Sequence, residues 1–369
     1  MPVLRHALSA RRRSEGRSLI VSPDDRVLIV APSWVGDAIL SEPLVARLRE
    51  RGVTQPIDVL APPWCGPVYA RIEGIGRILD NPAAHGEIAL ARRRALGRSL
   101  RETRYARAYV LPNTWKSALV PFFARIPQRI GYVGEARYGL LTQARKLDRR
   151  AVPRLVERYA ALADARDAKV RAASAPRLVP DAANRAAAVR ALGLATKQPV
   201  AILCPGAEFG PAKRWPAEHF VTLAKRLATD GFAIWILGSP NDRAQAVAVI
   251  EARGSTPIVD LTGRTDLGTA IDLLSIASVV VSNDSGLMHA AAAVGAPLVA
   301  LYGSSSPLYT PPLSATARIA KIDIACSPCF KRECPLGHFR CMRDLSPELV
   351  YNLARTPAAP TADPPQSPR

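Results

Sequence analysis

The sequence predicts an α/β protein with two doubly wound parallel sheets in tandem, facing each other across a crevice. Short apolar, β-branched runs alternate with amphipathic helical patterns, which is typical of parallel sheets with helices on both faces. The alternation starts twice, on either side of a polar, Ala/Arg-rich stretch at residues 160–197. The length of 369 residues also exceeds that of a usual single core.

The N-terminal unit begins with a buried strand at residues 25–32, DRVLIVAP, followed by apolar residues at helical spacing up to the stop at Gly52. Pro43 lies inside that helical pattern, so we expect a kink or a separate first turn, with Ser41 capping the longer helix. The segments PIDVLAP and YARAYVLP predict further strands.

The C-terminal unit repeats the alternation. PVAILCPGAEFG predicts a strand and a loop, and AEHFVTLAKRLATDG predicts an amphipathic helix that ends at Gly231. The segments FAIWILGSPND, TAIDLLSIA and SVVVSND then predict a strand and loop, a helix, and a final strand that leads into a loop. Each unit is expected to have its site at the strand ends.

The expected organisation has four parts. A basic, disordered tail covers residues 1–24, an N-terminal domain 25–170, a C-terminal domain 171–355, and a Pro-rich disordered tail 356–369. No apolar run reaches the ~18 residues that a membrane span needs, and the basic start lacks the apolar core of a signal peptide. A cytoplasmic enzyme is therefore expected.

The charge is concentrated in the N-terminal half. Of the net +19, residues 1–160 contribute +14, because 28 Lys and Arg face 14 Asp and Glu. This half either faces an anionic partner or has an Arg-rich solvated surface. No nucleic-acid-binding signature is present, whereas an anionic membrane surface or an acidic acceptor would fit.

The loop SNDSG joins a predicted strand to an Ala-rich helix. Ser285 and Gly286 would present free backbone N–H groups at the helix N-terminus, where the helix dipole also favours a phosphate. Alternatively, Asp284 or Ser285 only caps the helix. His289, one turn further on, could reach the same ligand or be structural.

A second loop, PGAEFGPAKRWPAEHF, has an irregular turn at Gly206 and Gly210, then Lys213 and Arg214 just before a helix. Basic residues in that position can neutralise a leaving diphosphate, although exposed Lys and Arg are more often only solvated. Trp215 is expected to pack against the helix start.

Two carboxylates follow strands. Asp242 in LGSPNDR could accept hydrogen bonds from ribose hydroxyls, or could be an ordinary turn residue. Asp37 follows Gly36 and points toward the same crevice, so it is a candidate general base or a helix cap. The absence of G-x-G-x-x-G and of G-x-x-x-x-G-K-[ST] argues against a dinucleotide dehydrogenase and a P-loop NTPase.

Together, APSWVGDAILSEP, PGAEFGPAKRWP, LGSPNDR, LTGRTDL and SNDSGLMHAAAAVGAPLVALYG resemble the heptosyltransferases of glycosyltransferase family 9, over residues 25–352. The resemblance implies a GT-B fold and an inverting, metal-independent transfer of L-glycero-D-manno-heptose from ADP-heptose, which the C-terminal domain binds. It implies no cofactor and no catalytic metal. By motif position it makes Asp37 the catalytic residue and places the donor on Lys213, Asp242, Asp284, Ser285, Gly286 and His289, with Gly36 and Gly206 as cleft backbone.

The resemblance also implies an acceptor for the basic half. The N-terminal domain would bind a phosphorylated, heptose-bearing Kdo-lipid A at the cytoplasmic face of the inner membrane, as a peripheral protein. Basic candidates for that surface are Arg93, Arg94, Lys116, Arg125 and Arg129. Other possibilities are another heptosyltransferase of the family, a sugar-nucleotide epimerase on the same fold, and a non-catalytic polyanion-binding protein.

Four of the six cysteines form the pattern Cys326-x2-Cys329-x4-Cys334-x6-Cys341, with His338 before the last. Disulfides are not expected in a cytosolic protein, so the two alternatives are a zinc site and reduced thiols that only pack. Zinc sites usually have two closely spaced pairs, and only Cys326/Cys329 has that spacing. No catalytic role is assigned to it.

Overall fold

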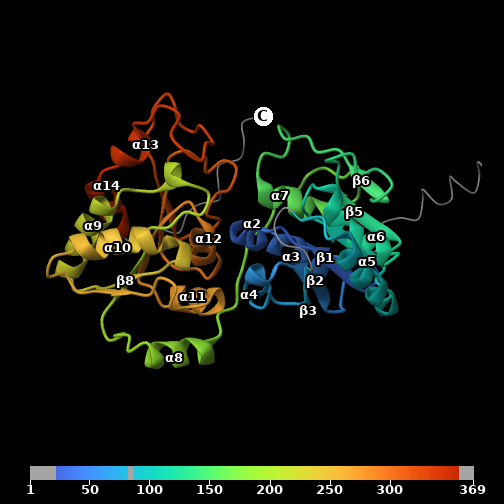
Figure 1. Ribbon diagram of the computed structural model, residues 1–369, viewed down its shortest axis with the longest axis horizontal. Coiled ribbons are helices and arrows are strands. Elements are labelled where there is room, and N and C mark those ends of the chain that lie inside the picture. The colour runs from blue at the N-terminus through green and yellow to red at the C-terminus, as the bar shows by residue number, and fades with distance from the viewer. Residues whose placement is uncertain (1–21, 82–86, 357–369) are drawn as a thin grey trace, which may run out of the picture.

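The computed structural model describes residues 22–81 and 87–356, which form two α/β domains (Figure 1). The predicted tails at 1–24 and 356–369 lie almost entirely outside these residues. Among the described residues, no helix combines the length and the apolar character needed to cross a membrane.

The N-terminal sheet has six parallel strands in the order β3-β2-β1-β4-β5-β6. The chain moves outward from β1 to β3 and then returns to β4, so the direction of winding reverses between β1 and β4. The inner strands are buried on both faces, as their unbroken apolar runs predict. The strands are β1 Val27–Val30, β2 Ile57–Ala61, β3 Ile75–Asp80, β4 Arg107–Val110, β5 Gln128–Tyr132 and β6 Gln143–Arg145.

The C-terminal sheet repeats this plan in the order β12-β11-β10-β7-β8-β9, again all parallel. Its winding reverses between β7 and β10, and ligands of doubly wound sheets bind at that point. The strands are β7 Val200–Cys204, β8 Ala233–Ile236, β9 Ile258–Asp260, β10 Val279–Asn283, β11 Leu298–Leu301 and β12 Ala317–Ala320. The predicted doubly wound architecture is therefore confirmed, whereas the domain boundary at residue 170 stays a prediction.

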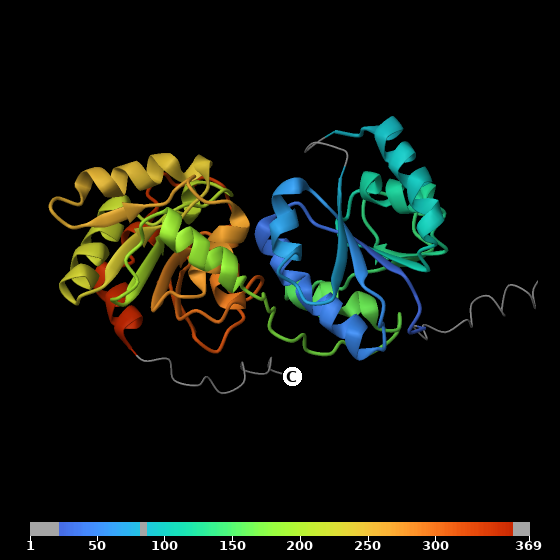
Figure 2. The ribbon, with the colours of Figure 1, turned by 90° about the horizontal axis from the view of Figure 1, so that it is seen from below.

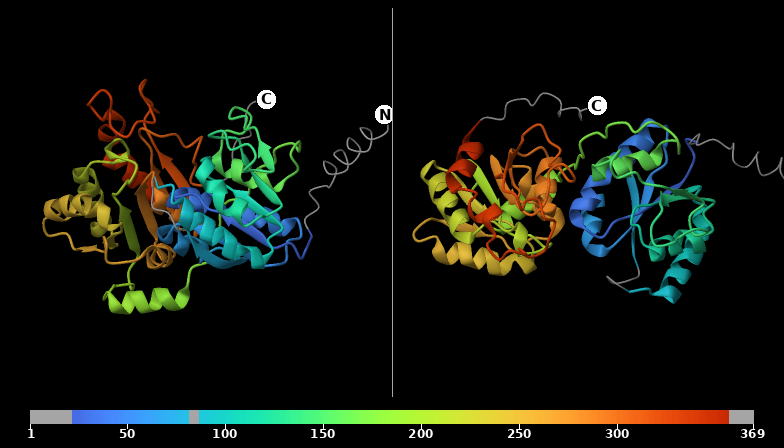
Figure 3. Two further views of the ribbon diagram at one scale, coloured as in Figure 1. Left: turned by 45° about the vertical axis from the view of Figure 1, so that its right-hand side comes forward. Right: turned by 90° about the horizontal axis from the view of Figure 1, so that it is seen from above.

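Helices cover both sheets, and the two bodies are seen side by side in Figure 2 and Figure 3. The N-terminal domain has α2 Val35–Leu40, α3 Glu42–Glu50, α4 Gly66–Tyr69, α5 Leu90–Ser99, α6 Leu119–Phe123 and α7 Leu155–Ala160. The C-terminal part has α8 Ala182–Ala191, α9 Ala217–Thr229, α10 Arg243–Ala252, α11 Leu267–Leu274, α12 Gly286–Ala293, α13 Arg340–Arg343 and α14 Pro347–Arg355.

The break predicted from Pro43 separates α2 from α3 at Ser41. Ser41 occupies the cap position of α3, but the expectation that its side chain caps the helix is wrong. Its hydroxyl instead donates to the carbonyl oxygen of Ala38 (2.7 Å) and lies 2.9 Å from the hydroxyl of Tyr69. With these two partners the hydroxyl does not cap α3. The residue in the first turn that favours the start of the helix is Pro43.

One ion pair joins the domains where the connecting segment enters α8. The guanidinium of Arg71, from the N-terminal domain, donates to both carboxylate oxygens of Asp272 on α11, at 2.9 and 2.6 Å. Asp272 is fully buried and also accepts hydrogen bonds from the backbone N–H of Asp181 and the side chain of Asn184. Its buried charge therefore depends on a partner from the other domain.

We expect Arg71→Ala to destabilise the protein by about 3 kcal/mol, because it leaves the Asp272 carboxylate buried without its countercharge. Urea unfolding followed by tryptophan fluorescence measures this. As a control, Lys321→Ala removes a cation that pairs with a 91% exposed Asp323 side chain, and should change the unfolding free energy by less than about 0.5 kcal/mol. Equal midpoints for the two variants would contradict the assigned role of Arg71.

Candidate functional site

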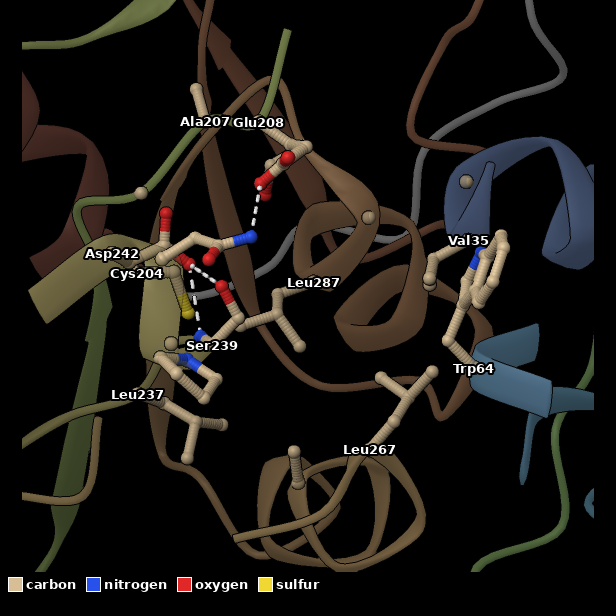
Figure 4. A pocket seen from close by; sticks show the side chains of 18 of the residues that line it. Val35, Trp64, Cys204, Ala207, Glu208, Leu237, Ser239, Asp242, Leu267 and Leu287 are labelled. Atoms are coloured by element: carbon tan, nitrogen blue, oxygen red, sulfur yellow. Dashed lines mark hydrogen bonds between the residues drawn. The ribbon is translucent and has the colours of Figure 1, made fainter. Parts of the chain in front are cut away.

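A cleft of about 850 Å³ lies between the domains at the carboxyl ends of the strands. Apolar side chains from both domains line it, and Val35, Trp64, Leu237, Leu267 and Leu287 are seen around the opening in Figure 4. Loops that follow β7, β8 and β10 supply its polar wall. Of the predicted site residues, Gly36, Gly206, Asp242, Ser285 and Gly286 line the cleft.

The first turns of α2 and α12 abut across the domain interface, and glycine makes this approach possible. A Cβ atom on Gly36 would lie 2.9 Å from Cδ2 of His289, and one on Gly286 would lie 2.9 Å from Cγ1 of Val35. A side chain at either position would force the facing side chain or the helix that carries it to shift. The glycines therefore set the spacing between the domains at the base of the cleft.

The N-terminus of α12 is left open toward the cleft. Ser285 stands at the cap position in extended conformation, and its side chain makes no capping hydrogen bond. The alternative that Asp284 or Ser285 serves as the cap is therefore wrong for this structure. Since the first amides of a helix have no partner within the helix, those that begin at Gly286 are available to an anion.

Asp284 instead organises a charged cluster beside the cleft. Its Oδ2 atom lies 2.5 Å from Nζ of Lys213 and accepts a hydrogen bond from the hydroxyl of Ser305 at 2.5 Å. The Lys213 ammonium also lies 5.0 Å from the ring centroid of Phe209. Asp284 thus holds Lys213 in place, and the sequence position of Asp284 alone does not predict this contact.

Asn283 ties the Lys213 loop to the end of β10. Its amide nitrogen donates to the carbonyl oxygen of Pro205 (2.8 Å), and its amide oxygen accepts from the backbone N–H of Trp215 (3.1 Å). Trp215 is buried against Phe220 at the start of α9, as predicted. Sequence reasoning missed Asn283 because a buried strand-end amide has no distinctive local pattern.

Asp37 lies in the first turn of α2, half-buried, close to Lys213 and Asp284 from the other domain. Burial raises the pKa of its carboxyl group to about 6; Lys213 acts against this increase and Asp284 adds to it. Within the described part of the chain, no side chain or amide donates a hydrogen bond to this carboxylate. Asp37 is thus an ionisable group near neutral pH, and its helix-cap alternative finds no support.

His289 faces Gly36 across the interface and is 5% exposed. Burial lowers its pKa to about 4; Asp284 opposes and Lys213 adds to this decrease, so the imidazole is neutral at pH 7. The neutral imidazole lies beside the charged groups Asp37, Lys213 and Asp284, and none of these four residues is part of the cleft wall.

Asp242 lies in a turn and in the cleft wall at once. Its Oδ2 atom accepts hydrogen bonds from the backbone N–H (2.9 Å) and the hydroxyl (2.8 Å) of Ser239, shown by dashed lines in Figure 4. The carboxylate lies directly over Gly206, where a Cβ atom would come within 2.1 Å of it. The turn interpretation is confirmed, and the ribose role stays a prediction.

Several lining residues were not named as site residues from the sequence, and three of them carry polar or aromatic groups at the cleft. Arg332 reaches the cleft from the Cys-rich region, with its Cζ atom 5.6 Å from the Phe209 ring centroid. Asp266, which caps α11 through the N–H of Thr269, and Trp34 also line the cleft. Trp34 and Asp266 lie in the motifs APSWVGDAILSEP and LTGRTDL, whereas Arg332 is brought to the site only by the placement of a distant loop.

The basic candidates of the N-terminal domain divide into two groups. Arg93 is buried and donates to the carbonyl oxygen of Ile88, and Arg129 donates to those of Ile126 and Leu140. These two arginines hold loops together, so the expectation that they form a binding surface is wrong. Arg94 and Arg125 are exposed, and Lys116 is half-buried.

Two doubly wound domains that face each other across a cleft at their strand ends define the GT-B class of glycosyltransferases. The chain belongs to glycosyltransferase family 9 (heptosyltransferase), whose family model matches residues 93–340. It is therefore a glycosyltransferase, and the expected epimerase and non-catalytic alternatives are not supported.

Named relatives are similar over almost their whole length. The chain is 42% identical over 335 residues to lipopolysaccharide heptosyltransferase 2 of Salmonella typhimurium, a match that covers 88% of this chain and 96% of that protein. It is also 42% identical to the Escherichia coli enzyme of the same name, with the same coverage. The solved E. coli ADP-heptose LPS heptosyltransferase II superposes with a TM-score of 0.79 at 39% identity, covering 89% of this chain and 97% of that one.

Proposed function

We propose that this chain transfers L-glycero-D-manno-heptose from ADP-heptose to the heptose-bearing Kdo2-lipid A inner core. The observation that supports this most is the position of Asp37, on one domain, against Lys213 and the open end of α12 on the other. That arrangement would provide a base and an anion site on opposite sides of a bound donor sugar. The particular sugar and acceptor are proposed from the names of the relatives.

The donor nucleotide would lie in the C-terminal half of the cleft. Its diphosphate would accept hydrogen bonds from the α12 amides and approach Lys213, whose charge stabilises the departing ADP. The apolar wall formed by Leu237, Leu267 and Leu287 fits the adenine, and the Asp242 carboxylate would accept from ribose hydroxyls. A lysine and helix-end amides can together neutralise the phosphate charge, so no metal is assigned to the reaction.

The acceptor hydroxyl would approach from the N-terminal domain. A hydroxyl at its ordinary pKa is a poor nucleophile, so Asp37 would remove its proton as the new bond to the anomeric carbon forms. The proton passes to the Asp37 carboxylate, and the electron pair of the broken bond leaves with the β-phosphate of ADP. Closure of the cleft would exclude water that could hydrolyse the donor.

The direct test is turnover of ADP-heptose with and without heptosylated Kdo2-lipid A, with release of ADP as the readout. We expect ADP release that requires the lipid, and a lipid product heavier by one heptose. Equal consumption of ADP-heptose without the acceptor, or transfer only to an acceptor lacking the first heptose, would contradict the proposal.

The acceptor is a polyanion, and the N-terminal half offers a matching surface. Arg94 and Arg98 on α5, Arg101 next to it and Arg125 after α6 lie near one another and are exposed. The side chain of Phe122, 40% exposed, lies in the same region. We propose that this surface faces the phosphorylated lipid and the anionic cytoplasmic face of the inner membrane.

We therefore expect the KM for the lipid acceptor to rise steeply between low and physiological salt, while the KM for ADP-heptose changes less. The reason is that exposed charges separated by about a Debye length, ~8–10 Å, are screened, whereas the buried Lys213 pair is not. Arg98→Ala/Arg125→Ala should reduce the salt dependence for the acceptor alone. Equal salt dependence for the two substrates would contradict this assignment.

A further inference from the structure

The wall of the cleft carries an excess of negative charge. Glu208, Asp242 and Asp266 contribute carboxylates to it. Within residues 22–81 and 87–356, Arg332 is the only Lys or Arg whose side chain lines this cleft. A nucleotide sugar brings further negative charge in its diphosphate, which the carboxylates repel. Arg332 is thus the one cation in this part of the wall that can offset that repulsion.

Lys213 contributes little net charge to the cleft as a whole. Its ammonium group lies 2.5 Å from a carboxylate oxygen of Asp284, so the two charges largely cancel except for a group that Lys213 contacts directly. Asp37, from the other domain, adds a negative charge beside the same pair. The β-phosphate gains charge when ADP departs, so a second cation near Lys213 would stabilise the departing group further.

Arg332 lies close to Lys213, with one aromatic ring near both cations. Cζ of Arg332 is 5.6 Å and Nζ of Lys213 is 5.0 Å from the centroid of the Phe209 ring. Attraction to the ring favours both positions despite the like charges. In the part of the chain that the structure describes, the exposed Arg332 side chain takes part in none of the ion pairs, so its N–H groups are available to a ligand.

The backbone of Arg332 is fixed to the loop that carries Lys213. Arg332 belongs to the segment between β12 and α13, residues 321–339, which contains no helix or strand. Its carbonyl oxygen accepts a hydrogen bond from the N–H of Ala212 (3.0 Å), the residue before Lys213. A Cβ atom on Gly210 would lie 2.5 Å from the same oxygen, so glycine permits this close approach.

The same segment is also tied to the loop after β11. The backbone N–H of Phe330 donates to the carbonyl oxygen of Ser304 (2.7 Å), and the Ser327 hydroxyl donates to that of Gly303 (2.7 Å). The cysteines of the segment are free thiols, and among the described side chains no group of three or more His, Cys, Asp or Glu could hold a metal ion. Hydrogen bonds to two loops of the site are thus the contacts that place Arg332 at the cleft.

We propose that Arg332 is a donor-binding residue whose guanidinium binds the β-phosphate of the nucleotide sugar together with Lys213. This inference rests on the proposed function, because it assumes an ADP-sugar in the cleft. A planar guanidinium can donate two parallel hydrogen bonds to phosphate oxygens, whereas an ammonium group acts as a point charge. Arg332 would therefore fix the orientation of the phosphate, and the irregular segment would serve to bring this side chain to the donor.

The test is the affinity for ADP and for AMP, measured by isothermal titration calorimetry. Arg332→Ala should weaken ADP binding by about 10–100-fold, the usual loss for a hydrogen bond to a charged group, and AMP binding by less than about 3-fold, because AMP has no β-phosphate. Arg332→Lys should restore only part of the ADP affinity. Lys331→Ala is the matched control: it removes the neighbouring exposed cation, which does not line the cleft, and should bind ADP like the wild type.

Arg332→Ala should fold normally, because the contacts that fix the segment use the backbone of Arg332 and not its side chain. An unchanged ADP affinity in Arg332→Ala would overturn the proposal, and so would equal losses for ADP and AMP. A raised KM for the lipid acceptor with unchanged ADP affinity would overturn it too, since the bound anion would then belong to the acceptor. A wild type that binds ADP but transfers no heptose would contradict the proposed function alone, whereas one that binds no ADP would contradict both.

Discussion

Asp37→Asn should lower kcat by about 10²–10⁴-fold while leaving the affinity for ADP-heptose nearly unchanged, because the change removes a general base and keeps the size of the side chain. Steady-state kinetics and a separate donor-binding titration measure the two quantities. Asp167→Asn, an exposed carboxylate in the segment that links the domains, is the matched control and should have wild-type kinetics. Normal turnover of Asp37→Asn would mean that another group accepts the proton.

The raised pKa of Asp37 gives two further signatures of the same residue. A base must be ionised, so kcat/KM of the wild type should rise with pH through about 6 and then level off. The free energy of unfolding changes with pH in the opposite direction, because the folded state binds the Asp37 proton more tightly than the unfolded state, in which the pKa is near 3.8. Stability contributed by this group is therefore lost as pH rises from about 4 through about 6.

It follows that Asp37→Asn should be more stable than the wild type at pH 7.5, by up to about 3 kcal/mol, from roughly two pKa units at about 1.4 kcal/mol each. A helix cap at this position would give the reverse result, since losing a cap destabilises. Thermal unfolding of the two proteins at pH 5 and pH 7.5 separates these outcomes.

Lys213→Ala should lower kcat by about 10²–10³-fold, because the ammonium group stabilises charge that develops on the leaving diphosphate. Lys213→Arg should restore only part of the rate, since a planar guanidinium does not place a point charge where the ammonium group lies. Lys225→Ala, which removes an exposed cation on α9, is the matched control and should not alter kcat.

Lys213→Ala has a side effect that must be separated from catalysis. It leaves the Asp284 carboxylate, 5% exposed, without its ion-pair partner, which destabilises the fold. The double variant Lys213→Ala/Asp284→Asn removes both charges, so its stability should recover while its rate stays low. Recovery of the rate in the double variant would show that Lys213 acts only by compensating Asp284.

The fold could be predicted because it rests on local pattern. Unbroken apolar runs such as residues 27–30 and 279–281 identify strands buried on both faces, and the Pro43 break predicts two helices where periodicity alone gives one. The strand-end loops could be predicted for the same reason, since function gathers where parallel strands end.

The side-chain partners within the site could not be predicted in this way. The Lys213–Asp284–Ser305 cluster and the contact between Gly36 and His289 join segments that are far apart in sequence, so they depend on the assembled domains. Arg93 and Arg129 show the opposite error. Exposure is the usual state of arginine, but here each guanidinium donates to loop carbonyl oxygens.

The central claim is a single displacement at the anomeric carbon, with Asp37 on one side and both Lys213 and the N-terminus of α12 on the other. The most direct test is the anomeric configuration of the newly transferred heptose, from the one-bond C1–H1 coupling of the isolated lipid product. A single displacement predicts the configuration opposite to that of the donor. Retention of the donor configuration would contradict it, because retention requires a different arrangement of reacting groups from the one proposed for this cleft.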